Sequence, residues 1–191
     1  MTVSTQKLLH DIALSMGMMT CDDNPYGCGV FMTGNGHMSE GFFWYVPHDD
    51  RFVLSRCDFV FKEDCPLSMP PQTRYIALRL DEANHLPPGK IIAFMEERGD
   101  FVDANIKRGT RIAYTEVLYF PLFYENRLDL CLSGSRHDPV VLLKNMGGEH
   151  NWPVEMMDIL VAIRSCELNG AAADLFYTGK AYELMAMPLK M

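Results

Sequence analysis

The chain is poor in basic residues, with 17 Lys and Arg against 25 Asp and Glu in 191 residues and a net charge of -8. Direct binding to nucleic acid needs clustered Lys and Arg that release counterions from the phosphates. The one modest basic cluster, Lys107, Arg108 and Arg111, is explained more simply as a solvated turn. We therefore expect no direct contact between these residues and nucleic acid.

Long apolar runs are also missing, because no segment approaches the roughly 20 residues of a membrane-spanning helix. The N-terminus does not resemble a signal peptide, since His10 and Asp11 interrupt its apolar stretch. There is no Cys-x-x-Cys motif and no cysteine at zinc-ligand spacing from a histidine. The six cysteines are Cys21, Cys28, Cys57, Cys65, Cys131 and Cys166. We expect a reduced, cytoplasmic protein that does not contact a membrane, with a redox-sensing pair of Cys21 and Cys28 as a minor alternative.

Signatures of enzymes are scarce as well. The six histidines lack the cupin metal pattern of two His separated by one residue and followed by a Glu. His37 and Glu40 are near each other, but their odd spacing places them on opposite faces of a strand. There is no Gly-x-Ser-x-Gly nucleophile motif and no glycine loop for phosphate. We expect no metal, no cofactor and no catalytic residues.

Short β-prone segments separated by turn residues fill the chain up to about residue 120. A helix over Ser4 to about Met18 precedes them, Gly34-Asn35-Gly36 predicts a hairpin turn, and Pro66, Pro70 and Pro71 predict a loop. The pattern is typical of an antiparallel barrel or sandwich. The expected strands are Cys28–Thr33, Gly41–Val46, Phe52–Leu54, Cys57–Lys62, Tyr75–Leu80, Ile91–Met95 and Arg111–Tyr119.

The hydrophobic period changes to that of helices after Pro121. Helices are expected over about 138–148, from Pro153 to Asn169-Gly170, and from about Ala171 to the C-terminus. Leu175, Tyr182 and Met185 share one face of the last helix. An apolar terminal helix docks on its own domain or on a partner, or marks the point where a larger protein has been cut.

Polar residues on apolar strand faces form the candidate binding site. Glu116 shares a face with Tyr114, and a carboxylate that points inward requires a partner. Arg74 and Arg79 flank the stretch around Leu78 and could supply the cation. Trp44 and Tyr45 lie on opposite faces of their strand. The predicted ligand-binding residues are Trp44, Tyr45, Arg74, Arg79, Tyr114 and Glu116, and the alternative is that the carboxylate is exposed and the aromatic residues are simply core.

Three segments resemble the N-terminal region of AraC/XylS-family transcriptional regulators. They are Gly109-Thr-Arg-Ile-Ala-Tyr-Thr-Glu-Val117, Tyr119-Phe-Pro-Leu-Phe-Tyr124 and Tyr177-Thr-Gly-Lys-Ala-Tyr-Glu-Leu184. The resemblance implies an α+β fold, in which a cupin-like antiparallel β-barrel of the jelly-roll type is followed by a small C-terminal helical layer. Residues 1–120 would form the effector-binding barrel with its N-terminal arm, and residues 121–191 a helical dimerisation subdomain.

The resemblance also implies a small-molecule effector, a homodimer, and DNA contact only through a C-terminal helix-turn-helix domain that this sequence does not contain. The expected dimer interface comprises Met156, Leu160, Ile163, Tyr182 and Met185, so that Leu160→Glu should give a monomer. Two other functions stay open. One is a small metal-independent isomerase or epimerase that uses Glu116 and Tyr114, and the other is a stand-alone interaction protein.

Overall fold

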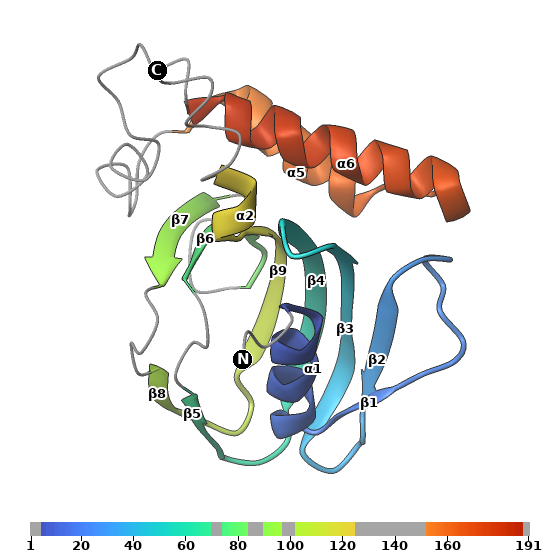
Figure 1. The fold of residues 1–191 in the computed structure, drawn as a ribbon. Coiled ribbons are helices and arrows are strands. Elements are labelled where there is room, and N and C mark those ends of the chain that lie inside the picture. The colour runs from blue at the N-terminus through green and yellow to red at the C-terminus, as the bar shows by residue number, and fades with distance from the viewer. Residues whose placement is uncertain (1–4, 70–73, 84–89, 97–101, 125–151, 189–191) are drawn as a thin grey trace.

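The computed structural model describes residues 5–69, 74–83, 90–96, 102–124 and 152–188. The predicted helix over 138–148 lies outside these ranges. The elements, shown in Figure 1, are α1 (Thr5–Ser15), β1 (Met18–Thr20), β2 (Val30–Gly34), β3 (Ser39–His48), β4 (Phe52–Phe61), β5 (Cys65–Met69), β6 (Tyr75–Asp81), β7 (Lys90–Glu96), β8 (Val102–Ile106), β9 (Arg111–Tyr119), α2 (Pro121–Tyr124), α5 (Val154–Arg164) and α6 (Gly170–Ala186).

The strands form a seven-stranded antiparallel sheet with the order β1-β2-β3-β4-β9-β6-β7, and β5 pairs separately with β8. The late strand β9 lies between β4 and β6, so its residues from Tyr114 to Tyr119 have cross-strand partners on both sides. The predicted α+β class is confirmed. Among the described strands no pairing joins β1 to β7, so the closed jelly-roll barrel stays a prediction.

Each face of the large sheet buries its own hydrophobic core. We call the side that packs against α5 and α6 the helix face, and it carries Phe52 and Leu54 of β4. The opposite side, the inner face, carries Val53 and Cys57 of β4 and packs against α1. Figure 1 shows α5 and α6 side by side, with α1 in a different part of the molecule. Alternation of side chains along each strand therefore decides which core a residue enters.

Most predicted elements form, with two instructive differences among the strands. The segments Phe52–Leu54 and Cys57–Lys62 join into the single strand β4, because Ser55 and Arg56 keep pairing with both neighbouring strands. The loop predicted at Pro66 is instead part of β5, whose one partner among the described strands is β8. A proline is tolerated there because its missing N–H can point away from the single partner strand.

The last helix docks on its own domain. The hydroxyl of Tyr119 in β9 donates a hydrogen bond to the carbonyl oxygen of Ala181 in α6 at 2.7 Å, and both residues are buried. Helix α5 ends at Arg164, earlier than predicted, and Asn169 occupies the position just before α6. None of the helices in the described ranges has both the length and the apolar character to cross a membrane.

Candidate ligand-binding site

Glu116 lies in the middle of β9 with its side chain on the inner face, where 3 % of it is exposed. Strand alternation places it with Ile112, Tyr114 and Leu118, which all contact the inner core, as the sequence predicts. A carboxylate at such a position is costly unless charged or polar groups satisfy it. The carboxylate of Glu116 therefore needs partners on the neighbouring strands.

Two cross-strand neighbours bind the carboxylate of Glu116. Arg79 of β6 donates from Nε to Oε2 at 2.7 Å, and its Nη2 forms an ion pair with the same oxygen at 2.6 Å. Ser55 of β4 donates from Oγ to Oε1 at 3.2 Å. Both residues are the direct register partners of Glu116, so three adjacent strands supply one polar row. The row exists because β9 is placed between β4 and β6.

The guanidinium of Arg79 is also held between two aromatic rings. Its Cζ lies 4.1 Å from the ring centroid of Tyr114 and 5.0 Å from that of Phe94 in β7. Its side chain is 29 % exposed, in contrast to its carboxylate partner, and both rings are half-buried. Within the described residues Nη1 of Arg79 forms no hydrogen bond. The site thus presents an oriented, partly exposed cation beside two aromatic rings.

The titrating groups around this pair are held in fixed protonation states. Burial acts to lower the pKa of Arg79, but attraction to Glu116 outweighs it and the pKa is raised above its ordinary value. Burial raises the pKa of Tyr114 well above its ordinary value, and the neighbouring Cys57 and Glu116 charges act in the same direction. Burial likewise raises the pKa of Cys57. At neutral pH these groups are a cation, a phenol and a thiol, a set suited to hydrogen bonding more than to proton transfer.

Only part of the predicted ligand-binding set comes together. Arg79 contacts both Glu116 and Tyr114 on the inner face. Tyr45 is buried on the same face, where its hydroxyl is 3.3 Å from Nδ1 of His10, and burial raises its pKa to about 12. Arg74 is half-buried just before β6.

Trp44 does not belong to this site. Its side chain lies in the core of the helix face, where Nε1 donates to the carbonyl oxygen of Cys28 at 2.8 Å. Strand alternation separates it from Tyr45, as the sequence predicts, so these two aromatic residues cannot line one pocket. The prediction that groups Trp44 with Glu116 is therefore wrong.

The predicted dimer interface is wrong for four of its five residues. Met156, Leu160, Ile163 and Met185 are buried inside the chain, against the helix face of the sheet. Tyr182 is half-buried beside the same core, with its ring centroid 4.9 Å from that of Phe123. The apolar residues of α5 and α6 are buried, as their pattern predicts, but the sheet of the same chain buries them.

Sequence reasoning missed two members of the site, Ser55 and Phe94. Ser55 lies between two of the predicted strands, and a small polar residue that is buried in a sheet needs a hydrogen-bond partner. Phe94 was included in a predicted strand, but only the pairing of β6 with β7 brings it next to Arg79. Register, which the sequence does not specify directly, determines both contacts.

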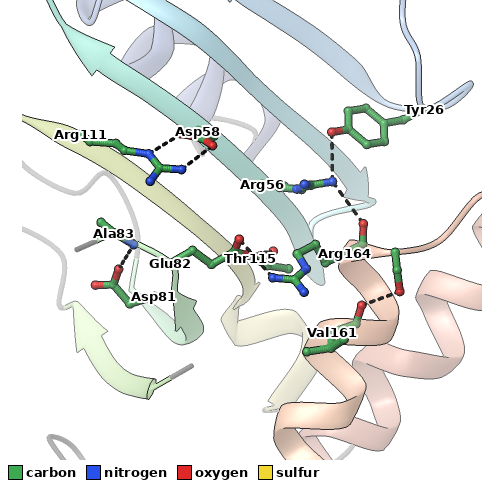
Figure 2. A network of polar contacts seen from close by, with 11 residues as sticks. Tyr26, Arg56, Asp58, Asp81, Glu82, Ala83, Arg111, Thr115, Val161 and Arg164 are labelled. Atoms are coloured by element: carbon green, nitrogen blue, oxygen red, sulfur yellow. Dashed lines mark hydrogen bonds and ion pairs between the residues drawn. The ribbon is translucent and has the colours of Figure 1, made fainter. Parts of the chain in front are cut away.

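A second polar network lies at the margin of the helix face (Figure 2). Arg56 of β4 donates from Nη1 to the Tyr26 hydroxyl and to the Arg164 carbonyl oxygen, each at 3.2 Å. Glu82 accepts a hydrogen bond from Thr115 at 3.0 Å and from Arg164 at 3.3 Å. This network connects the segment before β2, the sheet and the end of α5.

The described part of the chain contains no group of three His, Cys, Asp or Glu residues that could hold a metal ion. Comparison with protein-family models, with curated proteins and with solved structures gives no match.

Proposed function

We propose that this chain is the ligand-sensing portion of an AraC/XylS-type transcriptional regulator, with a cupin-like barrel that binds a small molecule beside Arg79. One observation carries the proposal, namely a buried carboxylate that holds a partly exposed guanidinium between two aromatic rings. The resemblance supports it, because the segment from Gly109 to Val117 contains Glu116 and the segment from Tyr177 to Leu184 lies in α6.

The geometry favours a ligand that combines a flat apolar part with an anionic or acceptor group. Glu116 occupies Nε and Nη2 of Arg79, so a ligand oxygen would approach Nη1. A carboxylate suits the guanidinium because charge-assisted hydrogen bonds are stronger than neutral ones. A planar ring could pack against Tyr114 or Phe94, both half-buried.

The site is connected to the helical layer through β9. Glu116 faces inward, whereas the next residue, Val117, and Tyr119 face α5 and α6. A ligand that binds one arrangement of β9 more tightly than another shifts the population toward it. In the proposed regulator that shift would reposition DNA-binding domains that follow this sequence. A homodimer through α5 or α6 would use outward side chains such as Leu175, which is 74 % exposed.

Thermal denaturation with chemically matched probes tests the binding site. Benzoate combines a ring with a carboxylate, whereas benzyl alcohol lacks the charge and acetate lacks the ring. We expect benzoate to raise the melting temperature most, because it can occupy both parts of the site. The shift should disappear in Arg79→Lys, since an ammonium cannot reproduce the planar fork of donors. Arg111→Lys, in an exposed pair with Asp58, is the matched control and should keep it. Equal shifts in both variants, or no shift with any probe, would count against the site.

The enzyme alternative predicts a different outcome. An isomerase or epimerase needs a group that exchanges protons near neutral pH. Tyr114 and Cys57 have raised pKa values and so stay protonated there, which favours binding over turnover. Chemical conversion of a bound sugar or hydroxy acid by the purified protein, lost in Tyr114→Phe, would support the enzyme instead.

A further inference from the structure

Two loops that are far apart in the sequence meet at the edge of the helix face. One connects β1 to β2 and contains Tyr26 and Gly27, and the other connects α5 to α6 and contains Asn169. A Cβ added to Gly27 would lie 2.7 Å from Cβ of Asn169, so the two backbones are in close contact. Arg56 joins the first loop to the end of α5 by donating to the Tyr26 hydroxyl and to the Arg164 carbonyl oxygen, as Figure 2 shows.

Each loop places a free cysteine beside this junction, and the first loop also contains Cys21. Cys28 follows Gly27 and Cys166 lies two residues after Arg164, and both are half-buried against the core of the helix face. The carbonyl oxygen of Cys28 accepts a hydrogen bond from Trp44, and Cys166 packs against the same core, which contains Tyr177. The rings of Trp44 and Tyr177 are themselves in contact, with centroids 5.6 Å apart.

Gly27, next to Cys28, lies against Asn169, three residues after Cys166, so the two cysteines lie in the same region. Burial raises the pKa of Cys28, and the charge of Cys166 acts in the same direction. The pKa of Tyr177 is also raised, first by burial and then by Cys166, with a contribution from Cys28. Cys21 has different surroundings, since its thiol points to the carbonyl oxygen of Asp23 at 3.9 Å. The structure therefore favours a pair of Cys28 and Cys166 over the pair of Cys21 and Cys28 considered from the sequence.

We propose that Cys28 and Cys166 form an intramolecular disulfide when the protein is exposed to a peroxide. The thiolate of one cysteine attacks a peroxide oxygen, the O–O bond breaks, and a sulfenic acid and one water are formed. The second thiol then attacks the sulfenyl sulfur and releases a second water. Both sulfurs are oxidised, the peroxide is reduced, and the new S–S bond links the segment before β2 to the α5–α6 connection.

This crosslink would fix the junction that Arg56 otherwise holds by two hydrogen bonds. It would restrict movement of the N-terminal segment relative to α5 and α6, and it would constrain the unfolded chain over a long loop. Because burial raises the pKa of Cys28, the thiolate is scarce at neutral pH and the reaction should be slow. We expect disulfide formation to accelerate as the pH rises toward 9.

Peptide mapping of the oxidised protein tests the pairing. The reduced protein, with Cys131→Ser to remove a competing thiol, is treated with hydrogen peroxide, alkylated with N-ethylmaleimide and digested with trypsin. No Lys or Arg lies between Leu8 and Arg51, so Cys21 and Cys28 fall in one tryptic peptide and Cys166 in another. We expect a disulfide between these two peptides that dithiothreitol cleaves.

Three single variants in that background assign the bond. Cys28→Ser and Cys166→Ser should each abolish the linked peptide, whereas Cys21→Ser, the matched control, should retain it. Oxidation should also raise the urea midpoint of the Cys21→Ser protein and leave that of Cys166→Ser unchanged. Absence of the linked peptide, its survival in Cys28→Ser, or its loss in Cys21→Ser would each overturn the proposal.

Discussion

The two faces of the central sheet bury their polar groups in different places. On the helix face, apolar and aromatic side chains from β4, β6 and β9 meet α5 and α6, and charged groups such as Arg56 and Arg164 lie at the margin. The inner face instead places a carboxylate and a guanidinium within its core, at Glu116 and Arg79. Packing of the layers against the sheet does not require a buried ion pair such as that of Glu116 and Arg79.

The two faces differ in what they contribute: the helix face stabilises the fold, and the inner face is the proposed binding surface. An apolar face gains stability in proportion to the area that it removes from water. A buried ion pair is weak evidence for stability, because the desolvation of both charges offsets most of their attraction. The helix face is therefore the structural side of the sheet, and the inner face is where we propose binding. Variants on each face can break or sharpen this contrast.

The largest effect is expected on the helix face from Leu160→Glu. Leu160 is fully buried, so the change removes the packing of a leucine, about 2–5 kcal/mol, and adds an unpaired buried charge. The sum approaches the whole stability of a typical domain, about 5–15 kcal/mol. We expect loss of the cooperative unfolding transition by circular dichroism, not the folded monomer that the sequence predicts.

Val154→Glu is the matched control on the same helix. Val154 is 72 % exposed at the start of α5, where a carboxylate also interacts favourably with the helix dipole. This variant should fold like the parent protein. If the parent protein is a dimer and Leu160→Glu is a folded monomer, the dimer interface predicted from the sequence would be supported.

The next largest effect is expected on the inner face from Arg79→Met. The substitution leaves the carboxylate of Glu116 buried without its cation, which costs about 3–5 kcal/mol in comparable cases. Adding Glu116→Leu should recover most of that loss, because an apolar pair of similar volume is often close to neutral. Urea unfolding of the two single variants and the double variant gives the coupling free energy.

Arg111→Met supplies the comparison with a surface pair. Arg111 binds Asp58 through two hydrogen bonds, but both side chains are more than two-fifths exposed. Solvent screens such a pair, so the unfolding free energy should hardly change. If Arg79→Met were as mild as Arg111→Met, the inner face would have to be open to water.

The contrast between the faces was only partly predictable from the sequence. Alternation along β9 correctly puts Glu116 with Tyr114 on one face and Val117 on the other, since the period of a strand is fixed at two residues. The need for a cation partner also followed from elementary electrostatics. The choice of Arg79 over Arg74 did not, because it depends on the register between β6 and β9.

The helical residues show a second limit. An apolar stripe on α5 predicts that Met156 and Leu160 are buried, but it does not say what buries them. A sheet face of the same chain and a second copy of the chain present the same apolar chemistry. The resemblance to dimeric regulators favoured the second, whereas the structure gives the first.

A smaller effect is expected from pH at the junction of β3 and α6. His48 is mostly buried and stacked on Phe52, and its Nδ1 lies 3.4 Å from a carboxylate oxygen of Asp174. Burial lowers the pKa of His48, although Asp174 and Asp49 act in the opposite direction. The unfolded chain then takes up a proton more readily than the folded chain, so stability is complete above about pH 6.5 and falls below it.

Urea midpoints at pH 7.5 and pH 5.5 measure this dependence. The parent protein should be less stable at the lower pH, and His48→Gln should show a smaller difference between the two. His37→Gln, at an exposed position, should keep the parental difference. Asp58 does not interfere, because its lowered pKa matters only below about pH 4. An unchanged slope in His48→Gln would place the sensitive group elsewhere.

The smallest effect is expected on the outward side of the helical layer, from Gly179→Ala. Gly179 lies inside α6, and a Cβ added there would meet no atom within 4 Å. Alanine should therefore stabilise the fold by about 0.5–1 kcal/mol, because it restricts the unfolded chain and favours the helix. The expected gain shows as a higher urea midpoint with an unchanged slope. A loss of stability that depends on protein concentration would instead mean that a second copy packs closely against this glycine, and would move the dimer contact to the outward face of α6.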